Sequence, residues 1–222
     1  YDGGPFPTRI SSDGVEILNA PIELLADLDG IPQPVRWSRA VQGESHADVV
    51  TMSGSGTVGE GERLRVDWHT RLYFDGVSRT EFTLTAPAPV TVKGLSLRYG
   101  LSADCGRYVL TPLYTPWQDG RLDLAFDPAP NQMKDFSLWV TGDDRGLFWW
   151  PESNANWVGE KSAKQIHLIH SAHGVAVDIA IIAKPVELKA PASYAMVFMG
   201  SPARPLPDKA RTFHEGGWGR VN

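Results

Sequence analysis

Residues 62–74 read Glu-Arg-Leu-Arg-Val-Asp-Trp-His-Thr-Arg-Leu-Tyr-Phe, and their alternation decides the fold. Every second side chain is non-polar, with Thr70 as the one polar interruption, and those between are mostly charged. Successive side chains of a β-strand point to opposite faces, so this pattern predicts a half-buried antiparallel strand. Asp75-Gly76 is a two-residue hairpin signal, and alternation resumes from Ser78 to Leu84. We expect the inner face to carry Leu64, Val66, Trp68, Leu72 and Phe74.

The same two-residue period recurs along the chain, with 22 glycines and 17 prolines marking the turns. No window shows a convincing amphipathic helix. Many short strands and almost no helix predict an all-β fold, a large two-sheet antiparallel β-sandwich of the super-sandwich type. Further strands are expected at residues 14–19, 22–28, 47–53, 95–99, 107–113, 121–126, 138–141, 147–150, 164–171, 174–183 and 193–199.

The end of the chain has a different composition. Ser201-Pro-Ala-Arg-Pro-Leu-Pro-Asp is rich in proline, which is typical of an extended connector between domains. We therefore expect residues 1–207 to form the sandwich domain and residues 208–222 to lead toward another domain.

Composition and charge exclude several classes of function. A net charge of −5 and a pI near 5.7 do not fit a nucleic-acid surface. The longest apolar run, residues 175–183, contains Asp178 and is too short to span a membrane, so no membrane association is expected. The single cysteine, Cys105, excludes an internal disulfide. The chain opens at Tyr1 without a methionine or an apolar signal region, which suggests a processed terminus, and we expect a secreted, periplasmic or cell-surface location.

Half of the eight tryptophans fall between residues 137 and 157, in a predicted hairpin with a turn at residues 142–146. Trp149 and Trp150 are adjacent on a strand and cannot both be buried in one core, so one is expected outside, near Glu152. An aromatic ring beside hydrogen-bonding acids suits a sugar. The alternative is a hairpin that only caps the core, with Asp143 and Asp144 as ordinary turn residues. The candidate carbohydrate-binding residues are Asp143, Asp144, Arg145, Trp149, Trp150, Glu152 and Trp157.

Other motifs predict no cofactor and no metal. Residues 54–59 have the glycine spacing of a dinucleotide fingerprint, but a strand follows instead of a helix, so we interpret them as a flexible loop between strands. His167, His170 and His173 have the spacing H-x-x-H-x-x-H, yet residues three apart on a strand face opposite ways, and His173 fits a turn.

Catalysis has weak support in the sequence. Glycoside hydrolysis needs two carboxylates at a defined separation. Asp143, Asp144 and Glu152 are close in the sequence, but we interpret them as polar residues that line a site and not as a catalytic pair. We therefore assign no catalytic residue.

Three segments resemble one family. Leu72-Tyr-Phe-Asp-Gly-Val, the stretch from Trp139 through Gly142-Asp-Asp-Arg-Gly-Leu to Glu152-Ser and Trp157, and Met199-Gly-Ser-Pro-Ala-Arg-Pro-Leu-Pro occur in the order seen in glycoside hydrolase family 123-like proteins and in domain-of-unknown-function family 6067. The chain departs from their pattern at Trp150-Pro151, before Glu152, and at Arg204, where the family has lysine.

The resemblance implies an amino-terminal β-sandwich of a multidomain glycosidase whose catalytic (β/α)₈ barrel is a separate domain. In family 123 the known activity removes β-linked N-acetylgalactosamine by a substrate-assisted mechanism, using an Asp-Glu pair on the barrel that has no counterpart here.

Three functions are consistent with these features. The first is a non-catalytic sandwich domain of a glycoside hydrolase, which packs on the catalytic barrel of the same polypeptide through an exposed apolar patch and lines its glycan cleft. The second is a freestanding carbohydrate-binding module. The third is a small β-sandwich polysaccharide lyase or hydrolase.

Overall fold

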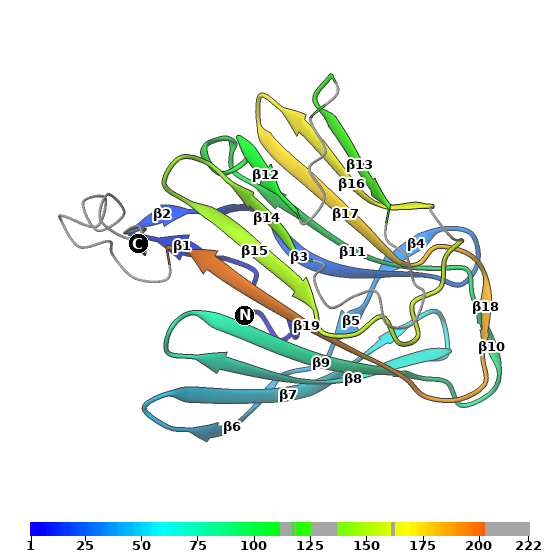
Figure 1. Ribbon diagram of the computed structural model, residues 1–222. Coiled ribbons are helices and arrows are strands. Elements are labelled where there is room, and N and C mark those ends of the chain that lie inside the picture. Colours follow the sequence, from blue (N-terminus) through cyan, green and yellow to red (C-terminus); the bar gives the residue numbers. More distant parts are fainter. Residues whose placement is uncertain (112–116, 118, 126–136, 161–162, 203–222) are drawn as a thin grey trace, which may run out of the picture.

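A computed structural model describes the chain except for residues 112–116, 118, 126–136, 161–162 and 203–222. The described residues form strands β1 to β19 and one short 3₁₀-helix, η1 (Ala103–Cys105) (Figure 1). The predicted all-β class with little helix is confirmed. Within this described part, no helix has the length and apolar character of a membrane span. The predicted connector, residues 208–222, lies outside the described residues.

The strands pair into two large antiparallel sheets. The larger has nine strands, in the order β12 (Tyr108–Leu110), β14 (Leu138–Thr141), β15 (Gly146–Pro151), β19 (Ala192–Ser201), β9 (Val77–Thr85), β8 (Leu64–Tyr73), β7 (Val49–Val58) and β5 (Arg36–Trp37), with β6 (Val41–Ser45) also paired to β7. The smaller has six, in the order β13 (Arg121–Ala125), β16 (Lys164–Ser171), β17 (Gly174–Ile182), β11 (Gly94–Leu101), β3 (Leu18–Asp27) and β4 (Pro32–Pro34).

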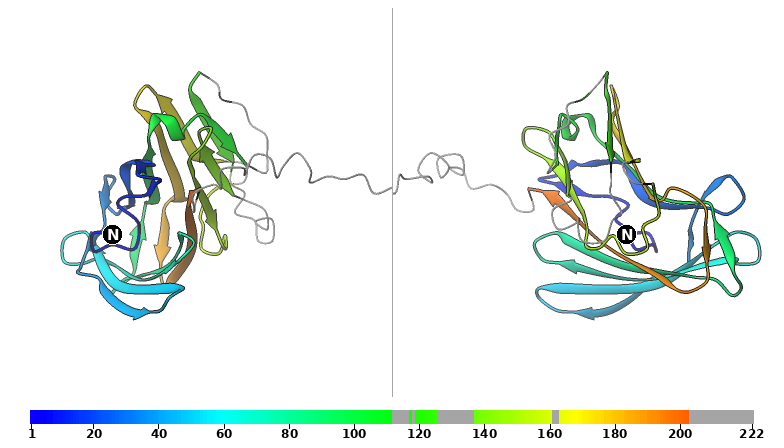
Figure 2. Two further views of the ribbon diagram at one scale, coloured as in Figure 1. Left: turned by 90° about the vertical axis from the view of Figure 1, so that its left-hand side faces the viewer. Right: turned by 45° about the vertical axis from the view of Figure 1, so that its right-hand side comes forward.

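Two short ribbons complete the fold. They pair β1 (Ser11–Ser12) with β2 (Val15–Glu16), and β10 (Val90–Val92) with β18 (Val186–Leu188). In the nine-stranded sheet, β7 to β9 run at an angle to β14 and β15, which reflects the usual twist of a large sheet (Figures 1 and 2).

The inner faces of the two sheets form one continuous hydrophobic core. Leu64, Val66 and Trp68 of β8 are buried in it, as their alternation predicted. The prediction was wrong for Phe74, whose side chain is 65% exposed. Strand β8 ends at Tyr73, so Phe74 lies in the hairpin turn, where the two-residue period no longer applies.

Thr70, the polar interruption of β8, is explained by the N-terminal segment. Its Oγ1 donates a hydrogen bond of 2.9 Å to the carbonyl of Pro5, and Thr80 donates another of 3.0 Å to the same oxygen. Both threonines are buried, so these bonds satisfy hydroxyls that would otherwise be costly in the core. Phe6, the next residue, packs edge-on against Phe82 and Phe198.

The predicted loop at residues 54–59 was wrong, because residues 54–58 continue β7. Gly54 lies opposite Trp68 of β8, and a Cβ there would come within 2.8 Å of the indole ring. A glycine at this position makes room for a tryptophan and is not a sign of flexibility.

The strands differ from the prediction in further places. Residues 14–19 and 22–28 were predicted as separate strands, but β3 runs through Pro21, beside a register shift opposite Tyr99. Such irregularities tolerate a residue without an N–H. Strands β1, β4, β5, β6, β10 and β18 were not predicted, because they are short or exposed and give no clear alternation.

We predict that Gly54→Ala lowers the free energy of unfolding by about 1–3 kcal/mol, because the added methyl group collides with the buried Trp68 ring. Gly94→Ala is the control, since its new Cβ would have no neighbour closer than 3.5 Å and should change stability by less than about 0.5 kcal/mol. Urea unfolding of both variants measures the difference. Equal stabilities would contradict close packing of Trp68 on β7.

Candidate functional site

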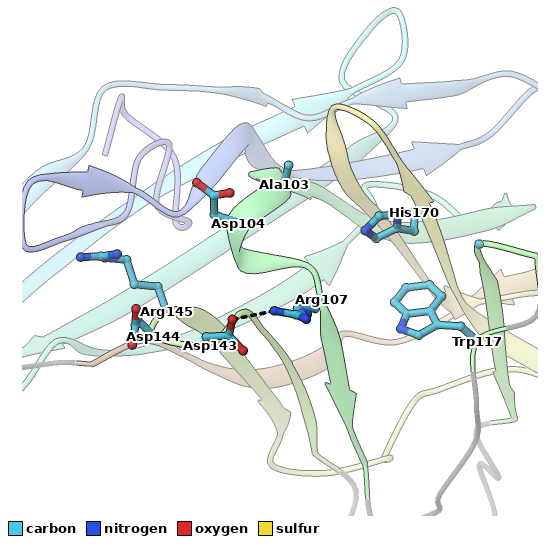
Figure 3. A pocket seen from close by; sticks show the side chains of 9 residues that line it. Ala103, Asp104, Arg107, Trp117, Asp143, Asp144, Arg145 and His170 are labelled. Atoms are coloured by element: carbon cyan, nitrogen blue, oxygen red, sulfur yellow. Dashed lines mark hydrogen bonds and ion pairs between the residues drawn. The ribbon is translucent and has the colours of Figure 1, made fainter. Parts of the chain in front are cut away.

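A cleft of about 620 Å³ opens at one end of the sandwich (Figure 3). It lies among η1, the β14–β15 turn, the segment before β13 and the end of β16. Most of the side chains that line it are polar or charged, namely Asp104, Arg107, Asp143, Asp144, Arg145 and His170, and Trp117, Ala103 and Gly120 complete the lining. Of the seven predicted site residues, the three in the β14–β15 turn, Asp143, Asp144 and Arg145, line this cleft.

The β14–β15 turn is fixed closely against η1. The Gly142 amide donates a 2.6 Å hydrogen bond to the carbonyl of Arg145, and Thr141 Oγ1 donates one of 2.9 Å to the same oxygen. A Cβ on Gly142 would overlap the carbonyl oxygen of Asp104, so only glycine allows this approach. The Gly-Asp-Asp-Arg sequence thus holds two aspartates at the mouth of the cleft.

Arg107 and Asp143 form an ion pair on one wall. Arg107 Nη1 donates to Asp143 Oδ2 at 2.7 Å (Figure 3). The guanidinium carbon of Arg107 lies 5.3 Å from the centre of the Tyr108 ring. Arg107 is therefore held by a carboxylate and by an aromatic ring.

Arg145 has a different role, because its guanidinium reaches the β1–β2 ribbon. Its Nε donates to the carbonyl of Ser12 at 3.2 Å, and its Nη2 is 3.8 Å from Asp13. The side chain fixes the turn to the N-terminal part of the chain.

Trp117 and His170 lie on the other side of the cleft, with their ring centres 5.8 Å apart and their planes at 73° (Figure 3). Trp117 precedes β13, and His170 is near the end of β16. Neither was predicted as a sugar contact. Nor were Asp104 and Arg107, since the four residues come from separate segments and no spacing in the sequence connects them.

The histidine motif does not converge in space. His167 is bonded through Nδ1 to Asp123 at 2.6 Å, His170 lies in the cleft, and His173 occupies the turn between β16 and β17. Among the residues that the structure describes, no cluster of three or more His, Cys, Asp or Glu side chains is arranged to hold a metal ion.

The tryptophan-rich hairpin divides its side chains between two faces. Trp149 and Trp157 are buried in the core with ring centres 6.3 Å apart, whereas Trp150 is 37% exposed on the outer face of the nine-stranded sheet. The expectation that only one of the adjacent pair could be buried is confirmed. Because the rings of Trp149 and Trp157 are buried, a ligand in solution cannot stack on them. Trp150 is the exposed tryptophan of the hairpin.

Glu152 lies away from the cleft and is engaged by Arg79. Two charge-assisted hydrogen bonds join them, Nε to Oε1 at 2.7 Å and Nη2 to Oε2 at 2.6 Å. Arg79 also pairs with Glu81 at 2.8 Å. These bonds raise the pKa of Arg79, and the hydrogen bond from Arg79 holds the pKa of the Glu81 carboxyl below its ordinary value.

The match to a family model agrees with a carbohydrate-related all-β domain. A sequence model of the family described as "Glycoside hydrolase 123, third domain" matches residues 5–147, more than half of the chain. The chain therefore belongs to this family, which confirms the resemblance. The description calls the unit a third domain, whereas the resemblance implied an amino-terminal one, and the order of the domains stays a prediction. None of the curated proteins matches the chain at a significant level.

Several solved structures show distant likeness. A galactose mutarotase related enzyme from Lactobacillus acidophilus has 9% identity and a TM-score of 0.44, over 89% of this chain and 91% of that one. Heparan sulfate lyase HepC from Pedobacter heparinus has 10% identity and a TM-score of 0.46, over 90% of this chain but only 28% of the lyase. A putative mutarotase (YeaD) from Salmonella typhimurium has 10% identity and a TM-score of 0.39, over 88% and 78%. These likenesses are too weak to assign a function.

The ion pairs of Arg79 with Glu81 and Glu152 lead to a prediction about how the stability of the fold changes in acid. A carboxyl whose pKa is depressed in the folded state stabilises the fold above its unfolded pKa, and this contribution is lost as the pH falls through the folded value. We expect Arg79→Gln to return the pKa of Glu81 toward its ordinary value, and to flatten the loss of stability between about pH 5 and about pH 3.

NMR titration of the Glu81 carboxyl and urea unfolding across this range provide the measurements. Arg98→Gln, whose partner is Asp178, is the control and should leave the Glu81 titration unchanged. An unaltered Glu81 titration in Arg79→Gln would contradict the pairing.

Proposed function

We propose that this chain is a non-catalytic domain of a multidomain glycoside hydrolase, and that it contacts glycan outside the cytoplasm through the cleft between η1 and the β14–β15 turn. Family membership supports the enzyme class, and the cleft supports the ligand class.

The chemistry of the cleft is the observation that carries the proposal. Sugars combine hydroxyl groups, which need donors and acceptors, with C–H faces that pack on aromatic rings. Arg107 supplies N–H donors, and His170 supplies ring nitrogens that can form hydrogen bonds. Asp104 and Asp143 supply carboxylate acceptors, and Trp117 supplies an aromatic ring. The volume of about 620 Å³ lies within the range of small-molecule sites.

The carboxylates of the cleft fit contact with a sugar better than hydrolysis of one. A general acid in a glycosidase needs a carboxyl group shielded from water, so that it stays protonated at working pH. Asp104, Asp143 and Asp144 are exposed, and Asp143 is paired with Arg107. Glu152 is distant from the cleft residues and bound to Arg79. This favours a domain that helps to line a site whose catalytic groups are elsewhere.

The outer faces of the two sheets differ in a way that supports packing on a catalytic domain. On the outer face of the nine-stranded sheet, five neighbouring strands each contribute one residue to a non-polar row. The residues lie directly opposite one another in the order Leu110, Trp139, Phe148, Met199 and Val77. The equivalent row on the six-stranded sheet is charged or polar throughout: Asp123, His167, Asp178, Arg98 and Glu23. Only the first resembles a face that another domain covers.

A freestanding carbohydrate-binding module is the second candidate, and the same exposed cleft favours it. The two differ in the affinity of the isolated chain, which should be high for a module and weak for a domain that only completes a site. A lyase or hydrolase would instead show turnover.

We predict that the isolated chain binds a member of a broad glycan panel without cleaving it. Calorimetry measures the affinity, and the mass of the glycan afterwards reveals cleavage. Trp117→Ala should weaken binding about tenfold or more, because it removes the aromatic wall of the cleft. Trp150→Ala is the matched control outside the cleft and should bind normally.

Each other result has a definite meaning. Cleavage would contradict the non-catalytic role. Loss of binding in Trp150→Ala alone would move the site to the outer face of the nine-stranded sheet. Absence of binding to every glycan would contradict a glycan contact by this chain alone and leave only a scaffold role.

Packing on a catalytic domain makes a separate prediction. Edge strand β12 carries Leu110, so its amides should exchange hydrogen more slowly in a polypeptide that includes the catalytic domain than in this chain alone. Leu110→Asp should abolish that protection, whereas Ile169→Asp, an equally exposed site on the other sheet, should not. Equal exchange in both polypeptides would rule out docking on this face.

A further inference from the structure

The Arg107–Asp143 pair has bonding capacity to spare. Both side chains are more than half exposed although they are paired, at 64% and 60%. Among the described residues, their bond uses one guanidinium nitrogen and one carboxylate oxygen. Further N–H groups of Arg107 and the second oxygen of Asp143 can therefore meet a ligand in the cleft.

The pair is fixed before any ligand arrives. Arg107 lies over the ring of Tyr108, which limits the rotation of its long side chain. Asp143 follows Gly142, whose backbone is bonded within the turn and packed on the carbonyl of Asp104. Groups held in this way lose little conformational entropy on binding, so their geometry can select a ligand.

Donor and acceptor character then define what the pair selects. Arginine only donates hydrogen bonds and an ionised carboxylate only accepts them, whereas a hydroxyl group does both. Two neighbouring hydroxyls can satisfy the pair together, one accepting from Arg107 and the other donating to Asp143. A carboxylate or sulfate group would bind Arg107 but be repelled by Asp143. An ammonium group would be attracted by Asp143 but repelled by Arg107.

We propose that the cleft recognises an uncharged sugar ring through two adjacent hydroxyl groups, bound at Arg107 and Asp143; this rests on the proposed glycan contact and specifies its chemistry. The charges of the whole cleft favour the same ligand, because its three carboxylates outnumber its two guanidinium groups and disfavour anions. Trp117 faces this wall beside His170 and is placed to receive the C–H face of the ring (Figure 3).

The test compares three kinds of probe that differ in one group. Methyl β-galactopyranoside and methyl β-glucopyranoside are the parent ligands. Their 3-deoxy analogues lose the hydroxyl that is common to both ring diols and so retain no adjacent pair. The corresponding 6-carboxylates keep the diols and add a negative charge. NMR titration of the Trp117 indole N–H, with the probes raised to their solubility limits, follows occupation of the cleft.

We expect both modified probes to bind about tenfold more weakly than at least one parent. The 3-deoxy probe loses a hydrogen bond to a charged group, and the 6-carboxylate is repelled by Asp143. Asp143→Asn should reduce the disadvantage of the 6-carboxylate to less than about threefold, since it removes the repelling charge. A purely structural role for Asp143 would not change this selectivity. Asp123→Asn, on the outer face of the six-stranded sheet, is the control and should retain both preferences.

Equal binding of parent and 3-deoxy probes, or tighter binding of the 6-carboxylate, would overturn the diol assignment and leave the glycan contact standing. Failure of every probe to shift the Trp117 signal would also overturn it. The glycan panel then decides separately whether the chain contacts glycan.

Discussion

Each of the two sheets has a non-polar inner face, and the structure depends on these inner faces covering each other. The alternation of β8 shows the requirement in its simplest form, since Leu64, Val66 and Trp68 have no other way to leave water. Close packing then restricts the backbone around them. The indole ring of Trp68 packs on β7 at a position where only glycine, Gly54, leaves enough room. The carbonyl of Pro5 supplies the hydrogen-bond acceptor that buried Thr70 needs.

The cleft is a consequence of how this core ends. At one end of the sandwich the connections η1 and residues 142–145 hold polar side chains at the surface. The bonds that position them, from Gly142 and Thr141 to Arg145 and from Arg145 to Ser12, lie in the turn and at the ends of the strands beside it. A rigid sandwich with a polar site on its loops is a common division of labour in all-β proteins.

The sequence predicted the fold class well because strand alternation is a local property. It also identified the Asp143–Arg145 turn, since Gly-Asp-Asp-Arg between two strands is a local signal. It could not place Arg107, Trp117 and His170 beside that turn, because their proximity results from the pairing of strands distant in sequence. Likewise, alternation showed that Trp149 and Trp150 face opposite ways, but only the neighbouring strands determine which face is covered. Gly54 and Gly56 were misread for a similar reason, because the rings that need their space, Trp68 and Trp37, belong to other strands.

The contact between Phe6 and Phe198 joins nearly the first residue of the described chain to its last strand, β19. During synthesis the amino-terminal segment leaves the ribosome long before its aromatic partner exists. Strand β19 also separates β9 from β15, so the larger sheet remains in two parts until this strand arrives. The domain therefore cannot complete its core one piece at a time as it is translated. The larger sheet and the core beneath it can be completed only after β19 has been translated, so the native structure of the domain depends on its last described strand.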